Sequence, residues 1–206
     1  MVRIVKKPEE RRQEIVATAR EFFQKKDYEN TTMRDIMDAL GIAKGTIYHY
    51  FKSKEELLEA VVEDYVDEYI AGMEKVLNET EGSGLDKVRA LIIAGNVEEQ
   101  YEDIIEHLHR PGNVSMHTRQ LAVTVSKLAP LYASAIRQGC EEGIFQTEHP
   151  LECAEFMLAG IQFLTDIGFH PWGQEDLIRR ATALPALIEA QLNAPKGSFA
   201  FFLEQI

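Results

Sequence analysis

Apolar residues near the start of the chain recur at the spacing of one helix face. The positions i, i+4, i+7 and i+8 of this face are occupied by Ile15, Ala19, Phe22 and Phe23. Pro8 suits the first turn of this helix, and the polar residues 27–31 predict a break after it. A capping box, Thr32-x-x-Asp35, predicts that a second helix begins there. Gly41 predicts the end of that second helix.

A short helix and two long ones are predicted next. The segment Lys44–Phe51 predicts a short helix, because Ile47 and Phe51 lie four residues apart on one face. Two further capping boxes predict the starts of long helices, and they are Ser53-x-x-Glu56 and Ser83-x-x-Asp86. The second long helix is expected to run to a break at residues 110–113, where Pro and Gly stand together.

The C-terminal half is also helical in pattern. Three helices are expected, at about residues 118–142, 150–168 and 174–192. Pro130 predicts a kink or interruption of the first, and Pro185 predicts a kink in the last. The tail, residues 193–206, either packs in a groove or frays. No alternating strand pattern of useful length occurs, so the predicted fold is all-α, with about nine helices.

Charge is distributed unevenly along the chain. The net charge is −12, but residues 1–55 hold 12 Lys and Arg against 9 Asp and Glu, a net charge of +3. The remaining residues hold 10 basic against 25 acidic side chains, a net charge of −15. This asymmetry is compatible with a polyanion near the N-terminal segment only, although a chance imbalance would look the same.

Several classes of protein are disfavoured. No apolar run approaches the length of a membrane span, and no secretory signal opens the chain. Cys140 and Cys153 provide neither a disulfide framework nor a zinc ribbon, which favours a reduced, cytoplasmic protein. No catalytic motif is present, and His107 and His109 would diverge on a helix, so we expect no enzyme, no cofactor and no metal site.

The segment Thr32–Leu58 has the plan of a helix-turn-helix, in which a second helix enters the major groove of DNA. Its first helix needs one apolar face to brace the second, and Gly41 permits the sharp turn between them. Three polar aromatic residues, 48–50, follow one another, so they cannot all face inward on one helix. We expect base, phosphate or backbone contacts from Thr32, Arg34, Lys44, Gly45, Thr46, Tyr48, His49, Tyr50, Lys52 and Lys54.

The run TMRDIMDALGIAKGTIYHYFKSKEELL resembles the signature of TetR-type transcriptional regulators. With the preceding helix, the resemblance covers about residues 9–69. It implies a three-helix DNA-binding domain at residues 9–69 and a helical domain for effector binding and dimerisation at residues 70–206. The implied partners are double-stranded operator DNA and a second copy of the chain.

The resemblance also implies how such a protein would work. The expected function is that of a dimeric repressor that a small effector releases from its operator; the alternative is an effector-independent or activating regulator with the same DNA-binding domain. The dimer would form through helices at about residues 151–168 and 174–192. Its apolar candidates are Phe156, Met157, Leu158, Ile161, Phe163, Leu164, Leu184 and Leu187. Polar candidates for lining the effector pocket are Asn96, Tyr101, His117, Gln162 and Thr165.

Overall fold

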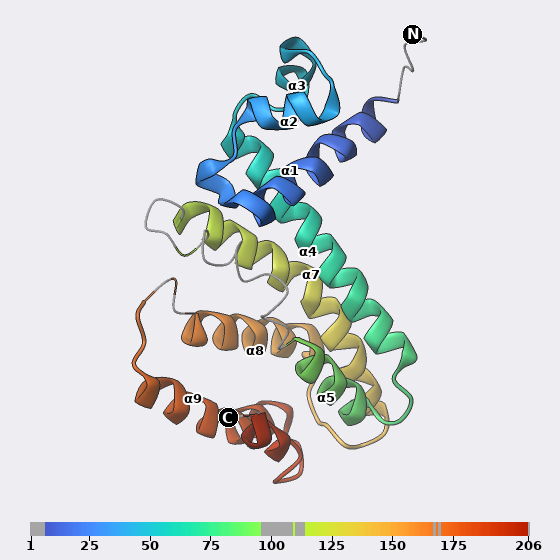
Figure 1. Ribbon diagram of the computed structural model, residues 1–206. Coiled ribbons are helices and arrows are strands. Elements are labelled where there is room, and N and C mark those ends of the chain that lie inside the picture. The colour runs from blue at the N-terminus through green and yellow to red at the C-terminus, as the bar shows by residue number, and fades with distance from the viewer. Residues whose placement is uncertain (1–6, 96–108, 110–113, 167, 169, 206) are drawn as a thin grey trace. The chain divides into compact units, whose positions relative to one another are not determined.

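All regular structure described for this chain is helical, which confirms the all-α prediction (Figure 1). The computed structural model describes residues 7–95, 109, 114–166, 168 and 170–205. Within them, no helix is both long enough and apolar enough to cross a membrane. The elements are α1 (Pro8–Asn30), α2 (Met33–Leu40), α3 (Lys44–Tyr50), α4 (Lys54–Glu79), α5 (Gly84–Gly95), α7 (Val114–Glu141), α8 (Pro150–Thr165), α9 (Gln174–Leu192) and the 3₁₀ helix η2 (Ala200–Gln205).

The chain separates into two compact units whose boundary falls inside α4. One unit, here called the head, contains described residues 7–67, and the other, the body, contains the described residues from Glu68 onward. The head therefore holds α1, α2, α3 and the first half of α4. The body holds the rest of α4 and all later helices.

The head is built around side chains that α1, α2, α3 and α4 bury together. The apolar face predicted for α1 is buried at Ile15, Ala19 and Phe23. The other helices contribute Ile36, Ile47, Phe51, Leu57 and Val61. Polar contacts add to this core: the Gln24 amide donates a hydrogen bond to the Tyr65 hydroxyl at 2.8 Å, which ties α1 to α4.

The predicted break after the first helix is a kink at one residue. Asp27 has a φ of 60° and leaves the helical conformation, and one last turn then reaches Asn30. The Asp27 carboxylate accepts hydrogen bonds from the Asn30 amide at 2.8 Å and from its side chain at 2.7 Å. The Thr31 hydroxyl donates to the Asp27 carbonyl at 2.7 Å. The polar side chains at the break thus form hydrogen bonds with one another and with the local backbone.

The body is closely packed where α5 meets α7. A β-carbon on Gly84 would lie 2.2 Å from the backbone nitrogen of Gly139 and 2.4 Å from the carbonyl oxygen of Ala135. Likewise, a β-carbon on Gly139 would lie 2.3 Å from the ring of Phe145. Two glycines therefore allow α5, α7 and the Phe145 ring to approach more closely than side chains would permit.

The helix ends in the body agree with those predicted except at three points, the first of which is that α7 begins at Val114, four residues before the predicted start at residue 118. Gly143, with a φ of 75°, follows the end of α7 as predicted, and the Ile144 amide donates to the Gly139 carbonyl at 2.8 Å. The interruption predicted before Pro130 is wrong, because α7 runs through this exposed proline. The prediction that α8 reaches residue 168 is also wrong: α8 ends at Thr165, with Asp166 as its C-cap.

The C-terminal tail packs on the body. Phe199 is fully buried and Phe201 is nearly so, and both belong to the core formed by α5, α7, α8 and α9. The Phe199 ring stacks on that of Phe145, with centroids 6.2 Å apart. The Glu189 carboxylate accepts hydrogen bonds from the backbone amides of Gly197 and Phe199. Between a packed and a frayed tail, the structure supports the packed one.

Candidate nucleic-acid interface

The first helix of the predicted helix-turn-helix begins with the capping box read from the sequence. The Thr32 amide and hydroxyl donate to the Asp35 carboxylate at 2.8 and 2.7 Å, and the Asp35 amide donates back to the Thr32 hydroxyl at 3.2 Å. Hydrogen bonds from the Thr32 hydroxyl and amide lower the pKa of Asp35. The ammonium of Lys26 lies 3.5 Å from the same carboxylate. Thr32 is exposed, and its side chain is occupied by the cap.

The turn between α2 and α3 depends on Gly41. Its φ of 61° is left-handed, a conformation that glycine adopts without a steric penalty. The Ile42 amide donates to the Met37 carbonyl at 3.1 Å, and the Gly41 amide donates to that of Asp38 at 3.3 Å. The chain can therefore reverse direction within three residues and begin α3 at Lys44.

The seven residues of α3 divide into a buried underside and an exposed face. Ile47 is fully buried, and Phe51, one turn later, is 1% exposed, with the Arg12 guanidinium 5.3 Å from its ring centroid. The Lys44, Tyr48 and His49 side chains are exposed. Around the helix, His49 lies opposite Ile47 and Tyr48 lies between them, whereas Lys44 lies near the side of Ile47 but is exposed at the start of the helix.

The three consecutive aromatic residues take different environments. Tyr48 and His49 are exposed, whereas Tyr50 is half-buried and its ring meets that of His49 edge-on at 5.1 Å. The Lys44 ammonium lies 5.6 Å from the centroid of the Tyr48 ring. The expectation that at least one of the three is exposed is therefore confirmed, since both Tyr48 and His49 are exposed.

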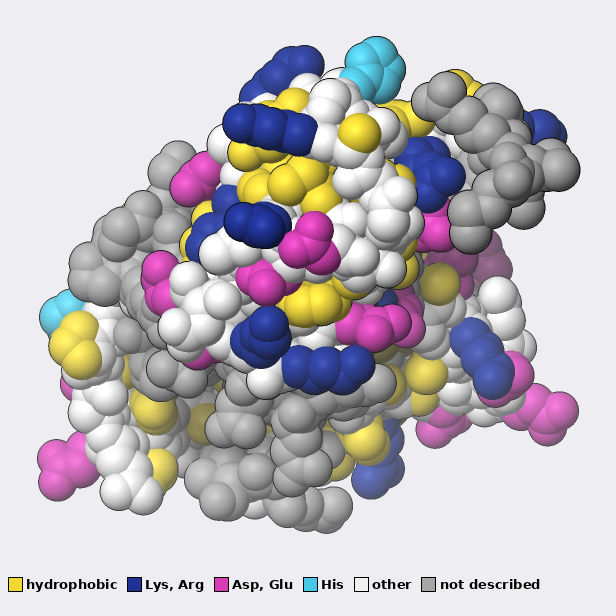
Figure 2. All heavy atoms as spheres, turned by 45° about the horizontal axis from the view of Figure 1, so that its top comes forward, with side chains coloured by type: hydrophobic (Ala, Val, Ile, Leu, Met, Phe, Trp, Pro, Cys, Tyr) yellow, Lys and Arg dark blue, Asp and Glu magenta, His cyan; other side chains and the backbone are white. Residues whose placement is uncertain are grey.

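The other residues predicted to touch DNA vary in exposure. Arg34 is the most open, with its side chain 84% exposed and 3.5 Å from Asp38. Gly45 and Lys52 are exposed, and Thr46 is half-buried. In Figure 2, Lys and Arg side chains are spread over the surface of the head, with some Asp and Glu among them. The head therefore presents α3 on a surface of mixed charge in which cations are common.

Lys54 makes contacts within the head that the sequence pattern does not predict. Its ammonium donates to the carbonyls of Tyr28 at 2.8 Å and Thr31 at 3.1 Å, and it lies 4.0 Å from the centroid of the Tyr28 ring. These carbonyls belong to the end of α1, where helical partners are missing. The lysine thus joins the start of α4 to the end of α1, and its head group is held by these contacts.

Only one of the two hydrogen bonds of the capping box predicted at Ser53 forms. The Glu56 amide donates to the Ser53 hydroxyl at 3.1 Å, as a cap requires. The Glu56 carboxylate, however, accepts from the amide of Lys52 at 2.5 Å, one residue earlier than in a capping box. The cap therefore includes the residue that links α3 to α4 and orders this connection.

The polar residues predicted to line an effector pocket lie in different environments. The His117 side chain is 4% exposed. The Gln162 side chain is partly buried, and its Oε1 atom is buried without a hydrogen-bond partner among the described residues. Thr165 is exposed, and its hydroxyl donates to the Ile161 carbonyl at 2.8 Å. Asn96 and Tyr101 lie outside the described residues.

The helices α8 and α9 expose large apolar side chains. Phe156 is 76% exposed, Phe163 53% and Leu187 63%, and Leu164 is exposed as well. Met157 and Leu158 face the body core instead, and Ile161 and Leu184 are partly buried. The apolar residues noted in the sequence thus serve two surfaces, one inside the body and one on its exterior.

Two family models match the chain, one in each part. Residues 15–61 match a model described as bacterial regulatory proteins, tetR family. Residues 94–187 match a model described as the tetracyclin repressor-like C-terminal domain. The first range includes α2, the Gly41 turn and α3, and the second includes α7 and α8.

Individual relatives agree with these models. The chain is 36% identical over 102 residues to the HTH-type transcriptional repressor KstR2 of Mycolicibacterium smegmatis, an alignment that covers 50% of this chain and 46% of that protein. It is 24% identical over 183 residues to KstR2 of Mycobacterium tuberculosis, which covers 84% of this chain and 88% of that protein.

A solved structure shows the same fold. The crystal structure of a TetR-family transcriptional regulator from Pectobacterium atrosepticum superimposes with a TM-score of 0.64 at 22% identity, over 91% of this chain and 96% of that one. The head geometry, the two family models and these relatives agree. The chain belongs to the TetR family of bacterial regulatory proteins and is a DNA-binding transcriptional regulator.

Proposed function

We propose that the protein acts as a dimeric repressor that binds operator DNA through α3 and is released by a small effector bound in the body. DNA binding is assigned to residues 9–69, and dimerisation and effector binding to residues 70–206. The observation that carries the proposal is the division of α3, in which Lys44, Tyr48 and His49 are exposed while Ile47 is buried. Two relatives are named as transcriptional repressors, which supports repression over activation.

DNA recognition is proposed to depend on two kinds of contact. The exposed N-terminal end of α3 presents Lys44, which suits a guanine edge or a phosphate, and Thr46, whose methyl group suits that of thymine. Tyr48 and His49 offer polar tips to the phosphates on either side. Gly45 lets the backbone approach the duplex, because no β-carbon intervenes and none of the described atoms lies near that position.

A dimer is proposed because one such helix reads too few base pairs for useful specificity. The exposed side chains of Phe156, Phe163 and Leu187 supply an apolar face on α8 and α9. Apolar side chains gathered in this way are typical of surfaces that another protein covers. A second copy related by a twofold axis would cover both faces at once.

Release by an effector is proposed to require two conformations of the dimer. The effector would favour the one whose heads do not match successive major grooves, about 34 Å apart on B-form DNA. Buried polar groups of the body, among them His117 and the Gln162 Oε1 atom, are the proposed contacts. The relatives are named as transcriptional regulators, and the proposal includes no catalytic step.

The experiment is a DNase footprint of the purified protein on the DNA upstream of its own gene, with two lysine variants. Lys44→Ala is expected to weaken binding about 10- to 100-fold and to lower the salt slope by about one. Lys75→Ala is the matched control: it removes an exposed lysine of the body whose ammonium lies 3.9 Å from the Glu79 carboxylate, so we expect an unchanged footprint.

Two results would contradict the proposal. One is binding by the unaltered protein without any sequence preference. The other is a Lys44→Ala variant with the affinity and salt slope of the parent. The sign of regulation is tested separately with a reporter behind the protected sequence: expression of the regulator should lower reporter output, and a rise would show an activator.

A further inference from the structure

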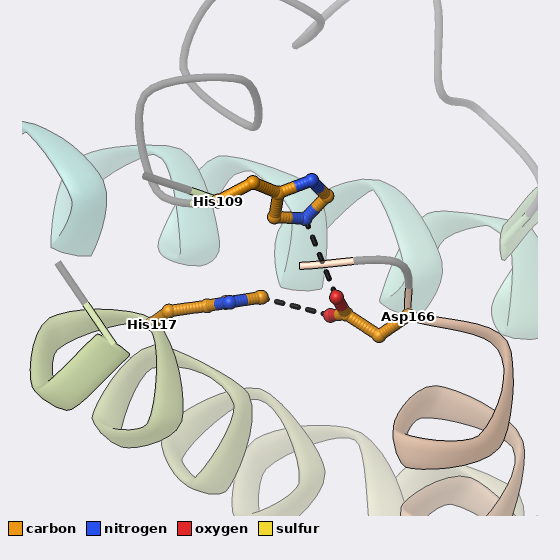
Figure 3. Close-up of side chains that lie close together, drawn as sticks. All are labelled: His109, His117 and Asp166. Carbon is orange, nitrogen blue, oxygen red and sulfur yellow. Dashed lines mark ion pairs between the residues drawn. The ribbon is translucent and has the colours of Figure 1, made fainter. Parts of the chain in front are cut away.

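Two histidines and an aspartate from separate parts of the body meet at one point (Figure 3). His117 lies in the first turn of α7, Asp166 caps the C-terminal end of α8, and His109 precedes α7. The Nε2 atom of His117 lies 2.9 Å from Asp166 Oδ2, and that of His109 lies 3.4 Å from Asp166 Oδ1. The ligand-capable atoms of the three residues all lie within 4.8 Å of one another.

The cluster is protected from solvent and held in place by the backbone. The side chains of His117, Asp166 and His109 are 4%, 11% and 22% exposed. The Gly168 amide donates to Asp166 Oδ1 at 2.7 Å. A β-carbon on Gly168 would lie 2.2 Å from the His109 ring, so the absence of a side chain there allows the imidazole its position.

The three side chains supply one carboxylate and two imidazoles, that is, one oxygen donor and two nitrogen donors. This donor set is common at zinc sites that keep one position open and at related transition-metal sites.

We propose that His109, His117 and Asp166 bind one divalent transition-metal ion of the Zn²⁺ class. With bonds of about 2.0–2.2 Å, the ligand atoms of a tetrahedral zinc site lie about 3.3–3.6 Å apart. The distances of 2.9 and 3.4 Å join the two imidazoles to different oxygens of Asp166, and one ligand atom from each residue can be chosen so that all three lie within 4.8 Å of one another. Rotation of the carboxylate and of the more exposed His109 would bring these atoms to the spacing of a bound ion.

The donor types argue against a Mg²⁺ or Ca²⁺ site. These ions prefer oxygen ligands and coordination numbers of six or more, whereas two of the three donors here are imidazole nitrogens. Three protein ligands leave a fourth position of a tetrahedral ion open for water or for an oxygen of another molecule. A bound ion would hold the start of α7 and the end of α8 together.

The competing interpretation is that the two histidines only balance the charge of a buried aspartate. Both interpretations predict that the cluster stabilises the body, so stability alone does not separate them. They differ in whether a metal ion binds in a ratio of one per chain and changes the spectrum of a suitable ion. The test therefore measures the metal directly.

The experiment uses the full chain, purified without a polyhistidine tag, stripped of metal by a chelator and dialysed against Zn²⁺ or Co²⁺. We expect one Zn²⁺ per chain by elemental analysis and visible absorption bands of four-coordinate Co²⁺. At a hundredfold excess over Kd, the metal should raise Tm by about 5–10 °C. Absence of a stoichiometric ion, or an octahedral Co²⁺ spectrum identical to that in buffer, would overturn the proposal.

Matched variants locate the site. Asp166→Asn keeps the side-chain shape but removes the charge, and His109→Gln alters the most exposed ligand; each should weaken Zn²⁺ binding at least about 100-fold. Gly168→Ala keeps all three ligands but displaces the His109 ring, so its affinity should also fall. His149→Gln, an exposed histidine at the other end of α8, should bind as the parent does. Equal affinity in all four variants would exclude the site.

A regulatory role for this ion rests on the proposed function, in which the body senses an effector. The metal measurements are made without DNA, so their failure would leave operator binding untouched. Conversely, a protein that binds Zn²⁺ but lacks a footprint would refute the repressor and retain the metal site. If both hold, Zn²⁺ should change the operator affinity of the parent and leave that of Asp166→Asn unchanged.

Discussion

The two candidate sites of this protein are built in opposite ways. In the head, the residues that would touch DNA are neighbours in one short helix, and most of their side chains are exposed. In the body, the residues that would bind a metal come from distant parts of the sequence and are largely buried. A large, charged partner needs an open surface, whereas a small ion needs donors that converge from several directions.

The two regions also differ in net charge. Residues 1–55 carry a net charge of +3, and the rest of the chain carries −15. Phosphate is therefore attracted by one region and repelled by the other over distances of about 8–10 Å at physiological salt. Each region therefore has its own physical requirements, and four substitutions test this difference between them.

The largest effect is expected from Phe51→Ala, which removes the most deeply buried ring of the head. Phe51 is 1% exposed, and truncation of such a ring costs about 3–5 kcal/mol in the free energy of unfolding. Hydrogen exchange followed by mass spectrometry should show lost protection in α1, α2 and α3, with α5 and α7 unaffected. Equal loss in the body would show that the regions unfold as one, and Tyr48→Ala, at an exposed position, serves as the control.

Phe156→Asp should separate the proposed dimer. The side chain is 76% exposed in the single chain, and an unpaired carboxylate buried in an interface costs about 3–5 kcal/mol. The dissociation constant of the dimer, measured by sedimentation equilibrium, should rise more than about 100-fold. The circular dichroism spectrum should stay that of a folded helical protein. Phe156→Leu keeps the surface apolar and should remain dimeric; an unchanged Phe156→Asp dimer would place the interface elsewhere.

Gly84→Ala tests the close approach of α5 and α7. Its β-carbon would meet backbone atoms of Gly139 and Ala135, which cannot rotate away, so we expect a loss of about 1–3 kcal/mol in the free energy of unfolding. Gly72→Ala in α4 is the matched control, because nothing lies within 4 Å of its β-carbon; it should stabilise by up to about 1 kcal/mol. Urea denaturation that ranks the two variants in the reverse order would contradict the packing.

Thr32→Ala should have the smallest effect, confined to the head. Loss of this helix cap costs about 1 kcal/mol. The Thr32 hydroxyl also helps to lower the pKa of Asp35, so that pKa should rise in the variant, as followed by NMR titration of the carboxyl carbon.

The sign of the pH dependence follows from the direction of this shift. Because the folded pKa of Asp35 lies below its unfolded value, its contribution to stability is present above the unfolded pKa and is lost as the pH falls through the folded one. The parent should therefore lose more stability than Thr32→Ala on acidification below about pH 4. An equal loss in both proteins would contradict this role of the cap.

Much of the head could be predicted from the sequence, because its features depend on neighbours. The Thr32 cap, the left-handed Gly41 and the buried pair Ile47 and Phe51 all follow from residues within a few positions. Lys54 shows where such reasoning stops. Its partners are backbone carbonyls more than twenty positions earlier, and no local pattern marks a carbonyl that lacks a donor.

In the body, the same reasoning gave the helices but not the candidate site. The sequence marks His117 as a polar residue on an apolar helix but does not connect it with His109 and Asp166, which lie beside it in the structure. The expectation of no metal site came from the spacing of His107 and His109, and that spacing holds no information on a ligand contributed by α8. In the structure α8 ends at Thr165, three residues before the predicted end, and its C-cap Asp166 lies beside the two histidines.

The burial of Phe199 has a consequence for the order in which the chain folds during synthesis. The head has all its described core residues once residue 66 has been made, whereas the body core still lacks Phe199 and Phe201. At about 5–20 residues per second, the ribosome needs on the order of ten seconds more to supply them. During that interval the surface around Phe145 lacks its last aromatic partner and stays exposed to solvent.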